Sequence, residues 1–166
     1  FMPCDVTMEG SLEAVFATIE KTWGRLDFLL HSIAWAPAED LHGRLTDSSG
    51  AGFAQSMLVS CHSFIRMAKL AEPLMTQGGS LTTLSFLGAE KVVDHYNIIR
   101  TRASSGIEHF DELIDETIRK APLRRTVTPD EVGRAALLLA SDYTTGTTGE
   151  VLHVDAGFNV AGMVFH

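Results

Sequence analysis

The chain has few cysteines, and its histidines lack the spacings that usually bind metal. The two cysteines, Cys4 and Cys61, are too few and too far apart for a disulfide framework or a metal-binding knuckle. The seven histidines show no HxxxH or HExxH spacing, so we predict no metal site. No apolar run approaches the ~20 residues that a membrane-spanning helix needs. The N-terminus shows neither a basic region nor a small-residue cleavage site, so we expect a cytoplasmic protein without an export signal.

Positive charge is also scarce. The 166 residues include 13 lysines and arginines against 21 aspartates and glutamates, a net charge of −8. This balance argues against nucleic acid or an anionic membrane as the partner. Apolar residues make up 45% of the chain, which suffices for a core. The length is that of one domain, so we predict a single domain over residues 1–166.

Helical spacing of apolar residues is the commonest pattern. It predicts helices over 11–23, 49–72 and 110–118. Gly24 ends the first helix, and Pro73 stands just past the second. A fourth helix has the clearest start, because Thr128 can cap it, Pro129 suits its first turn, and Glu131 completes a capping box.

Between the helices lie short apolar runs, "LDFLLHSIAW", "SLTTLSF" and "GEVLHVDAG". They predict strands near 27–33, 80–86 and 151–155, buried on both faces. Helices that alternate with such strands predict a parallel sheet covered on both sides, a doubly wound α/β fold. Three strands are few for this fold and would leave long apolar edges, so the sheet looks incomplete.

Tyr96 raises a question of catalysis. A tyrosine that acts as an acid usually has a lysine one or two helical turns further along. Here Arg100 stands four residues on and Ala103 seven residues on. Arginine keeps the charge of a lysine, but its planar guanidinium has a different shape. From residue type alone, Tyr96 is either a catalytic group or a loop residue with its hydroxyl in water.

Several motifs follow one another in an order typical of a known family: "PCDVT", "LDFLLHSIAWAP", "SLTTLSFLGAEKVVDHYN", "IRTRASSGI", "APLRRTVTPDEVGRAALLLASD" and "TGTTGEVLHVDAGFNVAGM". Together they resemble the NADH-dependent enoyl-acyl-carrier-protein reductases, a divergent branch of the short-chain dehydrogenases. The resemblance implies a single Rossmann-like domain that binds NADH and carries the catalytic site. This chain contains part of that domain. It also implies reduction of the trans-2 double bond of enoyl thioesters on acyl carrier protein, in type II fatty acid synthesis, by a homotetramer.

The same comparison implies two interruptions. The family's glycine-rich phosphate loop is expected before Phe1. A helix and a strand of ~35 residues, the size of a βαβ crossover, are missing between Asn97 and Ile98. The family's lysine falls within that missing stretch. Arg100 therefore matches the arginine of the family's "IRT" element and is not a displaced lysine.

The resemblance assigns site residues by position. Tyr96 is the catalytic group that stabilises the enolate oxygen. The residues expected to bind the cofactor are Cys4, Asp5, Val6, Ser32, Ile33, Ala34, Leu84, Ser85, Ile99 and Thr101. The residues expected to bind the substrate are Ala34, Trp35, Phe86, Tyr96, Ala103 and Ile107.

Some of these assignments have plain alternatives. Asp5 could instead cap the helix ahead of Ser11, and Trp35 could be an ordinary core residue. Phe86 departs from the family, since many members have a tyrosine in "LSYLGAE" where this chain has "LSFLGAE". His31 is more typical of a satisfied core histidine than of a base, and we assign it no catalytic role.

The resemblance also implies partners. Acyl carrier protein is acidic, so its docking needs local positive charge, for which Arg102, Lys120, Arg124 and Arg125 are candidates. The helix over 49–72 and the apolar C-terminus are the surfaces expected to meet other subunits. Two other functions stay open: a short-chain dehydrogenase that reduces a carbonyl, and an inactive subunit that lacks the lysine and the phosphate loop.

Overall fold

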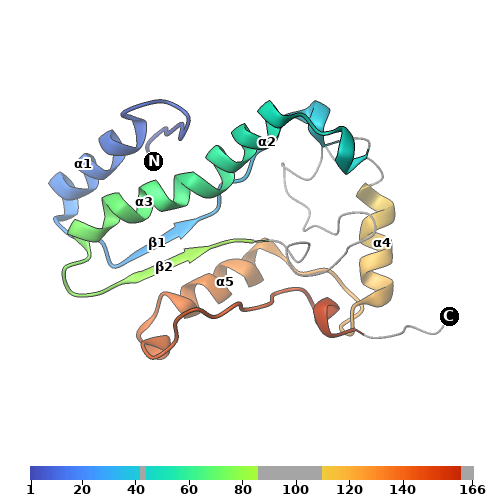
Figure 1. The fold of residues 1–166 in the computed structure, drawn as a ribbon. Coiled ribbons are helices and arrows are strands. Elements are labelled where there is room, and N and C mark those ends of the chain that lie inside the picture. The colour runs from blue at the N-terminus through green and yellow to red at the C-terminus, as the bar shows by residue number, and fades with distance from the viewer. Residues whose placement is uncertain (42–43, 86–109, 162–166) are drawn as a thin grey trace. The chain divides into compact units, whose positions relative to one another are not determined.

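The computed structural model describes residues 1–41, 44–85 and 110–161. These residues form two compact units, Phe1–Leu84 and Ser85–His166, which are described separately. Figure 1 shows the course of the chain in each unit.

The first unit opens with helix α1, Ser11–Trp23, as the apolar spacing predicts. Gly10 precedes it with a φ of 79°, a left-handed conformation that glycine adopts without strain. Gly24 ends it in the same region, at a φ of 70°, and its N–H donates to the carbonyl of Glu20 at 2.9 Å. The predicted stop at Gly24 is therefore confirmed.

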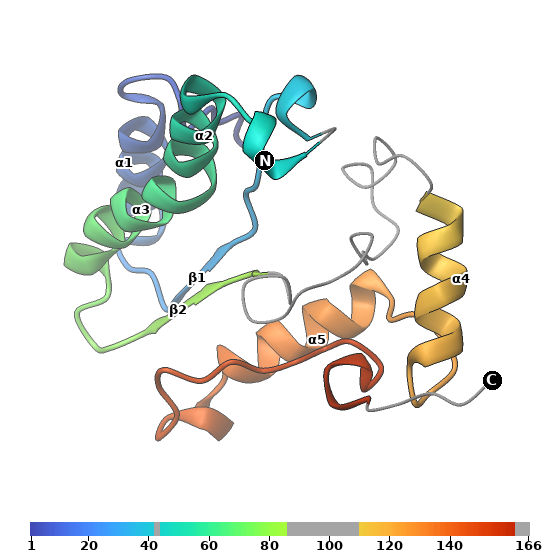
Figure 2. The same ribbon diagram turned by 45° about the vertical axis from the view of Figure 1, so that its right-hand side comes forward.

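The helix predicted over 49–72 is a continuous rod with one irregular turn. It consists of α2 (Gly50–Met57), a π-helical turn (Leu58–His62), α3 (Ser63–Ala71) and a 3-10 turn (Glu72–Leu74). The hydroxyl of Ser49 accepts from the Gly52 N–H at 2.9 Å and so caps the rod. Figures 1 and 2 show α3 running beside α1.

Two short parallel strands, β1 (Phe28–His31) and β2 (Ser80–Thr83), form the sheet of this unit. Their register pairs Phe28 with Ser80 and His31 with Thr83. Both strands are shorter than predicted, because the chain leaves the ladder soon after the pair of His31 and Thr83.

The core of the first unit lies between this sheet and the helices. One cluster joins Val6, Leu12 and Val59; a second joins Phe16, Ala71 and Leu74. Leu29 of β1 packs against the second cluster, so α1 and α3 cover one face of the strand.

The expected burial of β1 on both faces is met on one face only. Phe28 and Leu30, which point away from the helices, are 51% and 40% exposed. The reason is that α1 and α3 pack on the face of Leu29, and alternate residues of a strand point to opposite faces.

The second unit contains α4 (Phe110–Lys120) and α5 (Pro129–Leu139) among its described residues. The capping box of α5 is confirmed: the Glu131 N–H donates to the Thr128 hydroxyl, and the Glu131 carboxylate accepts from the Thr128 N–H at 2.8 Å. Two 3-10 turns follow, Asp142–Thr144 and Phe158–Val160.

The strand predicted over 151–155 is wrong, since the structure has no strand there. A strand needs a neighbour that supplies ladder hydrogen bonds. The described sheet contains only β1 and β2, and Val151 and Leu152 are exposed instead of buried. None of the helices in the described ranges is both long and apolar enough to cross a membrane.

Gly52 in α2 should not tolerate a methyl group. A Cβ there would lie 1.6 Å from Asp40 Oδ2 and 2.9 Å from Ser49 Oγ. The Asp40 carboxylate is held by the Ser49 N–H and hydroxyl at 2.6 and 2.8 Å. We expect Gly52→Ala to be less stable than Gly50→Ala by roughly 1–2 kcal/mol, because a Cβ at Gly50 meets nothing within 4 Å. Urea unfolding of both variants tests this; equal stabilities would contradict it.

Glu131 should titrate at unusually low pH. The guanidinium of Arg125 donates to its carboxylate at 2.7 and 2.9 Å, and with the Thr128 N–H it lowers the pKa of Glu131 to about 2. Since the folded pKa lies below the ordinary 4.5, the stabilisation is present above pH 4.5 and is lost as the pH falls through about 2. In an NMR titration, Arg125→Gln should raise this pKa towards 4.5, whereas Arg134→Gln should not.

Candidate active site

The carboxyl ends of β1 and β2 lie side by side. His31 and Thr83 form the last register pair, and the Leu84 N–H donates to the His31 carbonyl at 3.0 Å. The chain then continues from β1 into residues 32–34 and from β2 into residues 84–85, the segments predicted to bind the cofactor. In open α/β sheets, ligands bind beyond this end of the strands.

These segments present small, accessible groups. Ser32, Ala34, Leu84 and Ser85 are exposed, whereas Ile33 is half-buried against the cluster of Val6, Leu12 and Val59. Val6 is itself predicted to bind the cofactor, so one apolar cluster fixes both Val6 and the end of β1. Three of the predicted segments, around Val6, Ile33 and Leu84, therefore meet at one edge of the sheet.

Asp5 does not cap α1. The helix begins after Gly10, which makes no side-chain cap. Instead, Oδ1 of Asp5 accepts from the Thr7 N–H at 2.9 Å and from its hydroxyl at 2.7 Å. The hydrogen bonds from Thr7 lower the pKa of Asp5. Its carboxylate is thereby held ionised and oriented through one oxygen.

Cys4 is exposed and lies next to the first turn of α1. The hydroxyl of Ser11 points to its sulfur at 3.7 Å and accepts from the Asp5 N–H at 3.0 Å. These contacts fix the backbone of the Cys4–Val6 segment from the side of α1.

Arg66 of α3 holds the same segment from the other side. Its Nη1 donates to the Val6 carbonyl at 3.0 Å, and its Nη2 contacts the Glu13 carboxylate at 3.0 and 3.3 Å. One guanidinium thus ties the Val6 segment to α1 and α3.

Trp35 is not a core residue, because 46% of it is exposed. Its backbone is held by Ser60 of the π-helical turn: the Trp35 N–H donates to the Ser60 hydroxyl at 3.0 Å, and that hydroxyl donates to the Trp35 carbonyl at 3.2 Å. The indole is therefore presented at the surface from a fixed backbone.

His31 is a satisfied core histidine, as expected. Its Nε2 lies 2.8 Å from Ser63 Oγ and its Nδ1 lies 3.0 Å from Thr83 Oγ1. Burial lowers the pKa of the imidazole below its usual 6.5, so the ring is neutral at physiological pH.

The other predicted site residues lie outside the described residues. They are Phe86, Tyr96, Ile99, Thr101, Ala103 and Ile107. Their roles stay predictions.

Sequence reasoning missed the residues that hold these segments in place, Arg66, Ser60 and Ser63. The two serines stand three apart, a spacing that hints at a shared face of a helix. Nothing in the sequence indicates that Arg66 has this role, since an arginine on a helix is usually solvated.

The described residues fit a dinucleotide. The strand ends expose small side chains that let a ribose approach the backbone, and the Asp5 carboxylate can accept from the exocyclic amine of an adenine through its second oxygen. This arrangement suits the binding of a cofactor. The Ser63 hydroxyl does lie beside the His31 imidazole, at 2.8 Å, but both residues are 1% exposed, so this pair is not placed to attack a substrate.

Comparison with known proteins identifies the family. The profile of the family described as "Enoyl-(Acyl carrier protein) reductase" matches residues 1–99 and 97–159. An NADH enoyl-[acyl-carrier-protein] reductase of a Nostoc species is 39% identical over 98% of the chain and 76% of the relative. That of Bacillus subtilis is 35% identical over 96% of the chain and 74% of the relative.

Solved structures agree. The reductase of Anaplasma phagocytophilum in complex with NAD gives a TM-score of 0.89 at 40% identity, over 98% of this chain and 74% of that one. The Bacillus cereus reductase with NADP+ and indole naphthyridinone gives a TM-score of 0.92 at 34% identity, over 98% of this chain and 76% of that one. The predicted doubly wound α/β fold of the short-chain dehydrogenase type is confirmed by this likeness.

The matches agree with an interruption near the predicted point between Asn97 and Ile98. The two stretches of the family profile meet at residues 97–99. The match to the Nostoc reductase spans 196 residues, which is 30 more than the 166 of this chain. With the order of its motifs, the pairing of its strands and these likenesses, the chain belongs to the enoyl-(acyl carrier protein) reductase family.

Proposed function

We propose that this protein reduces the trans-2 double bond of enoyl thioesters with NADH, as a step of type II fatty acid synthesis. The observation that carries the proposal is the edge of the sheet where residues 32–34 and 84–85 emerge from paired parallel strands. Val6 lies against the same apolar cluster as Ile33. This edge belongs to the family's motifs and has the small, exposed groups that a nicotinamide and its ribose need.

The cofactor would be held by residues from four parts of the chain. Cys4, Asp5 and Val6 would lie along the adenine. Ser32 to Ala34 and Leu84 to Ser85 would lie along the nicotinamide ribose, and Ile99 and Thr101 near the nicotinamide and the pyrophosphate. NADH, when bound, supplies the hydride for the β-carbon of the enoyl thioester.

Tyr96 would act on the charge that this addition creates. Negative charge develops on the thioester oxygen, and a phenol hydrogen-bonded to that oxygen stabilises the enolate as it forms. The α-carbon then takes a proton from water, which converts the enolate into the saturated thioester. Positive charge nearby would bring the pKa of a tyrosine towards the working pH.

The substrate pocket would be apolar. Ala34, Trp35 and Phe86 would form one wall, and Ala103 and Ile107 the other, because a fatty acyl chain needs an uncharged surface. The exposed indole of Trp35 on a fixed backbone supports this placement. Phe86 keeps the apolar wall without the hydroxyl of the family's tyrosine.

The proposed carrier is acyl carrier protein. Support comes from four basic residues that lie close together in the sequence at the end of α4 and just beyond it: Arg119, Lys120, Arg124 and Arg125. Lys120 and Arg125 also pair with Glu116 and Glu131 of this chain, at 2.8 and 2.7 Å. An acidic carrier would therefore compete with internal carboxylates at this surface.

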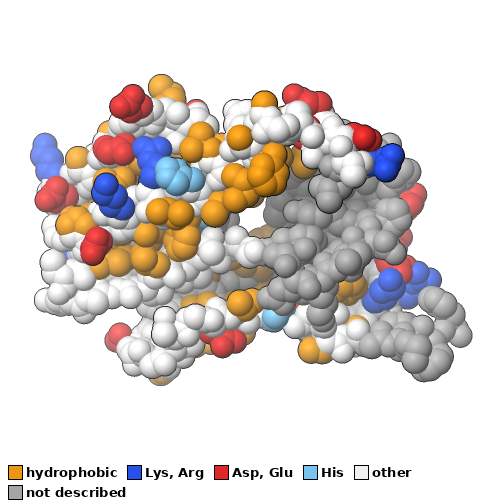
Figure 3. Space-filling view, in the orientation of Figure 1, with side chains coloured by type: hydrophobic (Ala, Val, Ile, Leu, Met, Phe, Trp, Pro, Cys, Tyr) orange, Lys and Arg blue, Asp and Glu red, His pale blue; other side chains and the backbone are white. Residues whose placement is uncertain are grey.

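A homotetramer in the cytoplasm completes the proposal. Phe53, Met57 and Ile65 of the α2–α3 rod are 65%, 47% and 60% exposed. Figure 3 shows apolar side chains gathered on the face over this rod. Contact with another subunit would remove that apolar surface from water. Sedimentation of the purified chain tests the tetramer.

The direct test of function is NADH oxidation at 340 nm with a crotonyl thioester, with NADPH and a ketone as comparison arms. The intact mass is recorded first, against 18.1 kDa for these 166 residues. Oxidation with the thioester supports the proposal. Oxidation with the ketone alone favours a carbonyl-reducing dehydrogenase. If the purified protein has a mass of 18.1 kDa and oxidises NADH with neither substrate, the result favours an inactive subunit.

Tyr96→Phe should lower kcat by about 10²–10³-fold and leave the Kd for NADH unchanged, because it removes a hydrogen bond made to the developing enolate. The chain offers a matched control in Tyr143, its only other tyrosine, which is 92% exposed. Tyr143→Phe should leave kcat at the wild-type value. Equal rates for both variants in the crotonyl assay would remove Tyr96 from the mechanism.

Arg66→Gln should weaken NADH binding while kcat at saturating NADH stays the same, because the Val6 carbonyl loses the donor that fixes the adenine-binding segment. We expect the Kd to rise about tenfold, the equivalent of one hydrogen bond. The control is Arg134→Gln, since that side chain is exposed and pairs with Asp130 only at 3.9 Å. Titration of NADH fluorescence measures both; an unchanged Kd in Arg66→Gln contradicts the assignment.

A further inference from the structure

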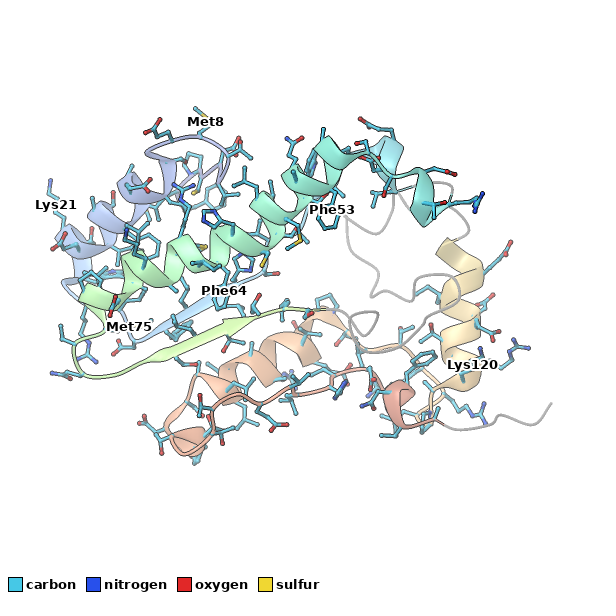
Figure 4. All side chains as sticks on the ribbon, in the orientation of Figure 1. Met8, Lys21, Phe53, Phe64, Met75 and Lys120 are labelled. Atoms are coloured by element: carbon cyan, nitrogen blue, oxygen red, sulfur yellow. The ribbon has the colours of Figure 1, made fainter. Side chains whose placement is uncertain are left out.

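His31 is buried at the point where three elements of the first unit meet. It is the last residue of β1, and only 1% of it is exposed. Its ring contacts β2 through Thr83 and the first turn of α3 through Ser63. The ring of Phe64 packs against the imidazole with centroids 5.2 Å apart, from the side of α3 that faces β1 (Figure 4).

The hydrogen bonds that link Thr83, His31 and Ser63 have a single consistent donor-to-acceptor direction. The Ser63 hydroxyl lies 2.7 Å from the Val59 carbonyl, which can only accept, so the hydroxyl donates there. Ser63 Oγ must then accept from the N–H at Nε2 of His31. A neutral imidazole has one donor and one acceptor nitrogen, so Nδ1 accepts from the Thr83 hydroxyl at 3.0 Å, in preference to the Leu84 carbonyl, which lies 3.5 Å from the same hydroxyl oxygen. The chain of donors runs from Thr83 through His31 and Ser63 to Val59.

This chain ends in the π-helical turn Leu58–His62, to which Val59 belongs. The same turn carries Ser60, whose hydroxyl holds the N–H and the carbonyl of Trp35. One turn of helix therefore fixes both ends of the segment Ser32–Trp35, at His31 through Ser63 and at Trp35 through Ser60. Turns of this kind are frequent at functional sites.

Packing alone does not require this arrangement. An apolar residue could fill the position of His31 without the desolvation of two polar nitrogens and the buried Ser63 hydroxyl. A fully satisfied polar group in a core instead selects one arrangement of its neighbours, because any displacement leaves a buried donor or acceptor unpaired.

We propose that His31 is a positioning residue: together with Ser63 and Thr83, it sets the conformation of Ser32–Trp35 and of Leu84 relative to each other. Its catalytic consequence rests on the proposed function, in which these residues meet the nicotinamide ribose and the substrate. His31 itself does not touch the reacting atoms. It acts through the backbone that follows it and through Leu84, whose N–H donates to its carbonyl.

The experiment compares variants that break the chain of hydrogen bonds with one that only weakens the core. Thr83→Val removes the donor to Nδ1 at similar side-chain volume, and Ser63→Ala removes the acceptor for Nε2–H. Thr83→Ser keeps the hydroxyl and serves as the rescue. Phe16→Leu, in the cluster with Ala71 and Leu74, is the matched destabilised control.

Two readouts are taken on the full chain. Amide hydrogen exchange by mass spectrometry follows the peptide over 32–35, where the Trp35 N–H is protected by Ser60 and where Ser60→Ala is the positive control. Steady-state kinetics with NADH and a crotonyl thioester give kcat and KM. Urea unfolding gives the stability of each variant.

We expect Thr83→Val and Ser63→Ala to speed exchange over 32–35 about five- to tenfold, the factor that matches one hydrogen bond. Their kcat should fall on the order of tenfold, since small displacements at a site can cost up to about a hundredfold. Thr83→Ser should restore both values, and Phe16→Leu should change neither.

The proposal is overturned if Thr83→Val and Ser63→Ala lose stability as Phe16→Leu does but keep wild-type exchange over 32–35 and wild-type kcat. His31 is then only a core residue. If the wild-type chain has no reductase activity, the proposed function fails, and the exchange measurement alone still decides whether His31 positions the segment.

Discussion

The parallel pairing of β1 with β2 determines the rest of the first unit. Parallel strands cannot be joined by a tight turn, so the chain between His31 and Ser80 must return to the start of the sheet. The α2–α3 rod supplies that return, and it packs with α1 over one face of β1. Because both strands point the same way, their carboxyl ends lie at one edge. The candidate site exists at that edge for this reason.

The sequence predicted this frame well, because its signals are local. Leu12 and Phe16 recur at helical spacing and are buried in α1. Thr128, Pro129 and Glu131 form a capping box as their spacing indicates. Such features depend on residues a few positions apart, so a single sequence contains all the information they need.

The rest depends on residues far apart in the chain. The bond from Arg66 to the Val6 carbonyl spans 60 residues, and nothing around Arg66 in the sequence indicates it. The apolar run at 151–155 reads as a strand, but a strand forms only beside a neighbour. The one-sided burial of β1 has the same cause, because an apolar side chain is buried only where a second layer packs over it. The family resemblance predicted the roles of residues from 86 to 109, which lie outside the described residues.

The π-helical turn has a consequence for how the rod can vary. A π turn holds about one residue more than an α turn, so it acts as a one-residue insertion in an otherwise regular helix. The core-facing residues Val59, Ser63, Met67 and Ala71 recur every four positions, a repeat slightly longer than the 3.6 residues of an α turn. The additional residue in the π-helical turn helps to keep these four residues on the core-facing side of the rod. Loss of a single residue from Leu58–His62 would rotate α3 by about 100° relative to α2, move its core-facing side chains to the flank of the helix, and turn Ser63 away from β1. The length of this turn is thus under a stricter constraint than the identity of most residues in it.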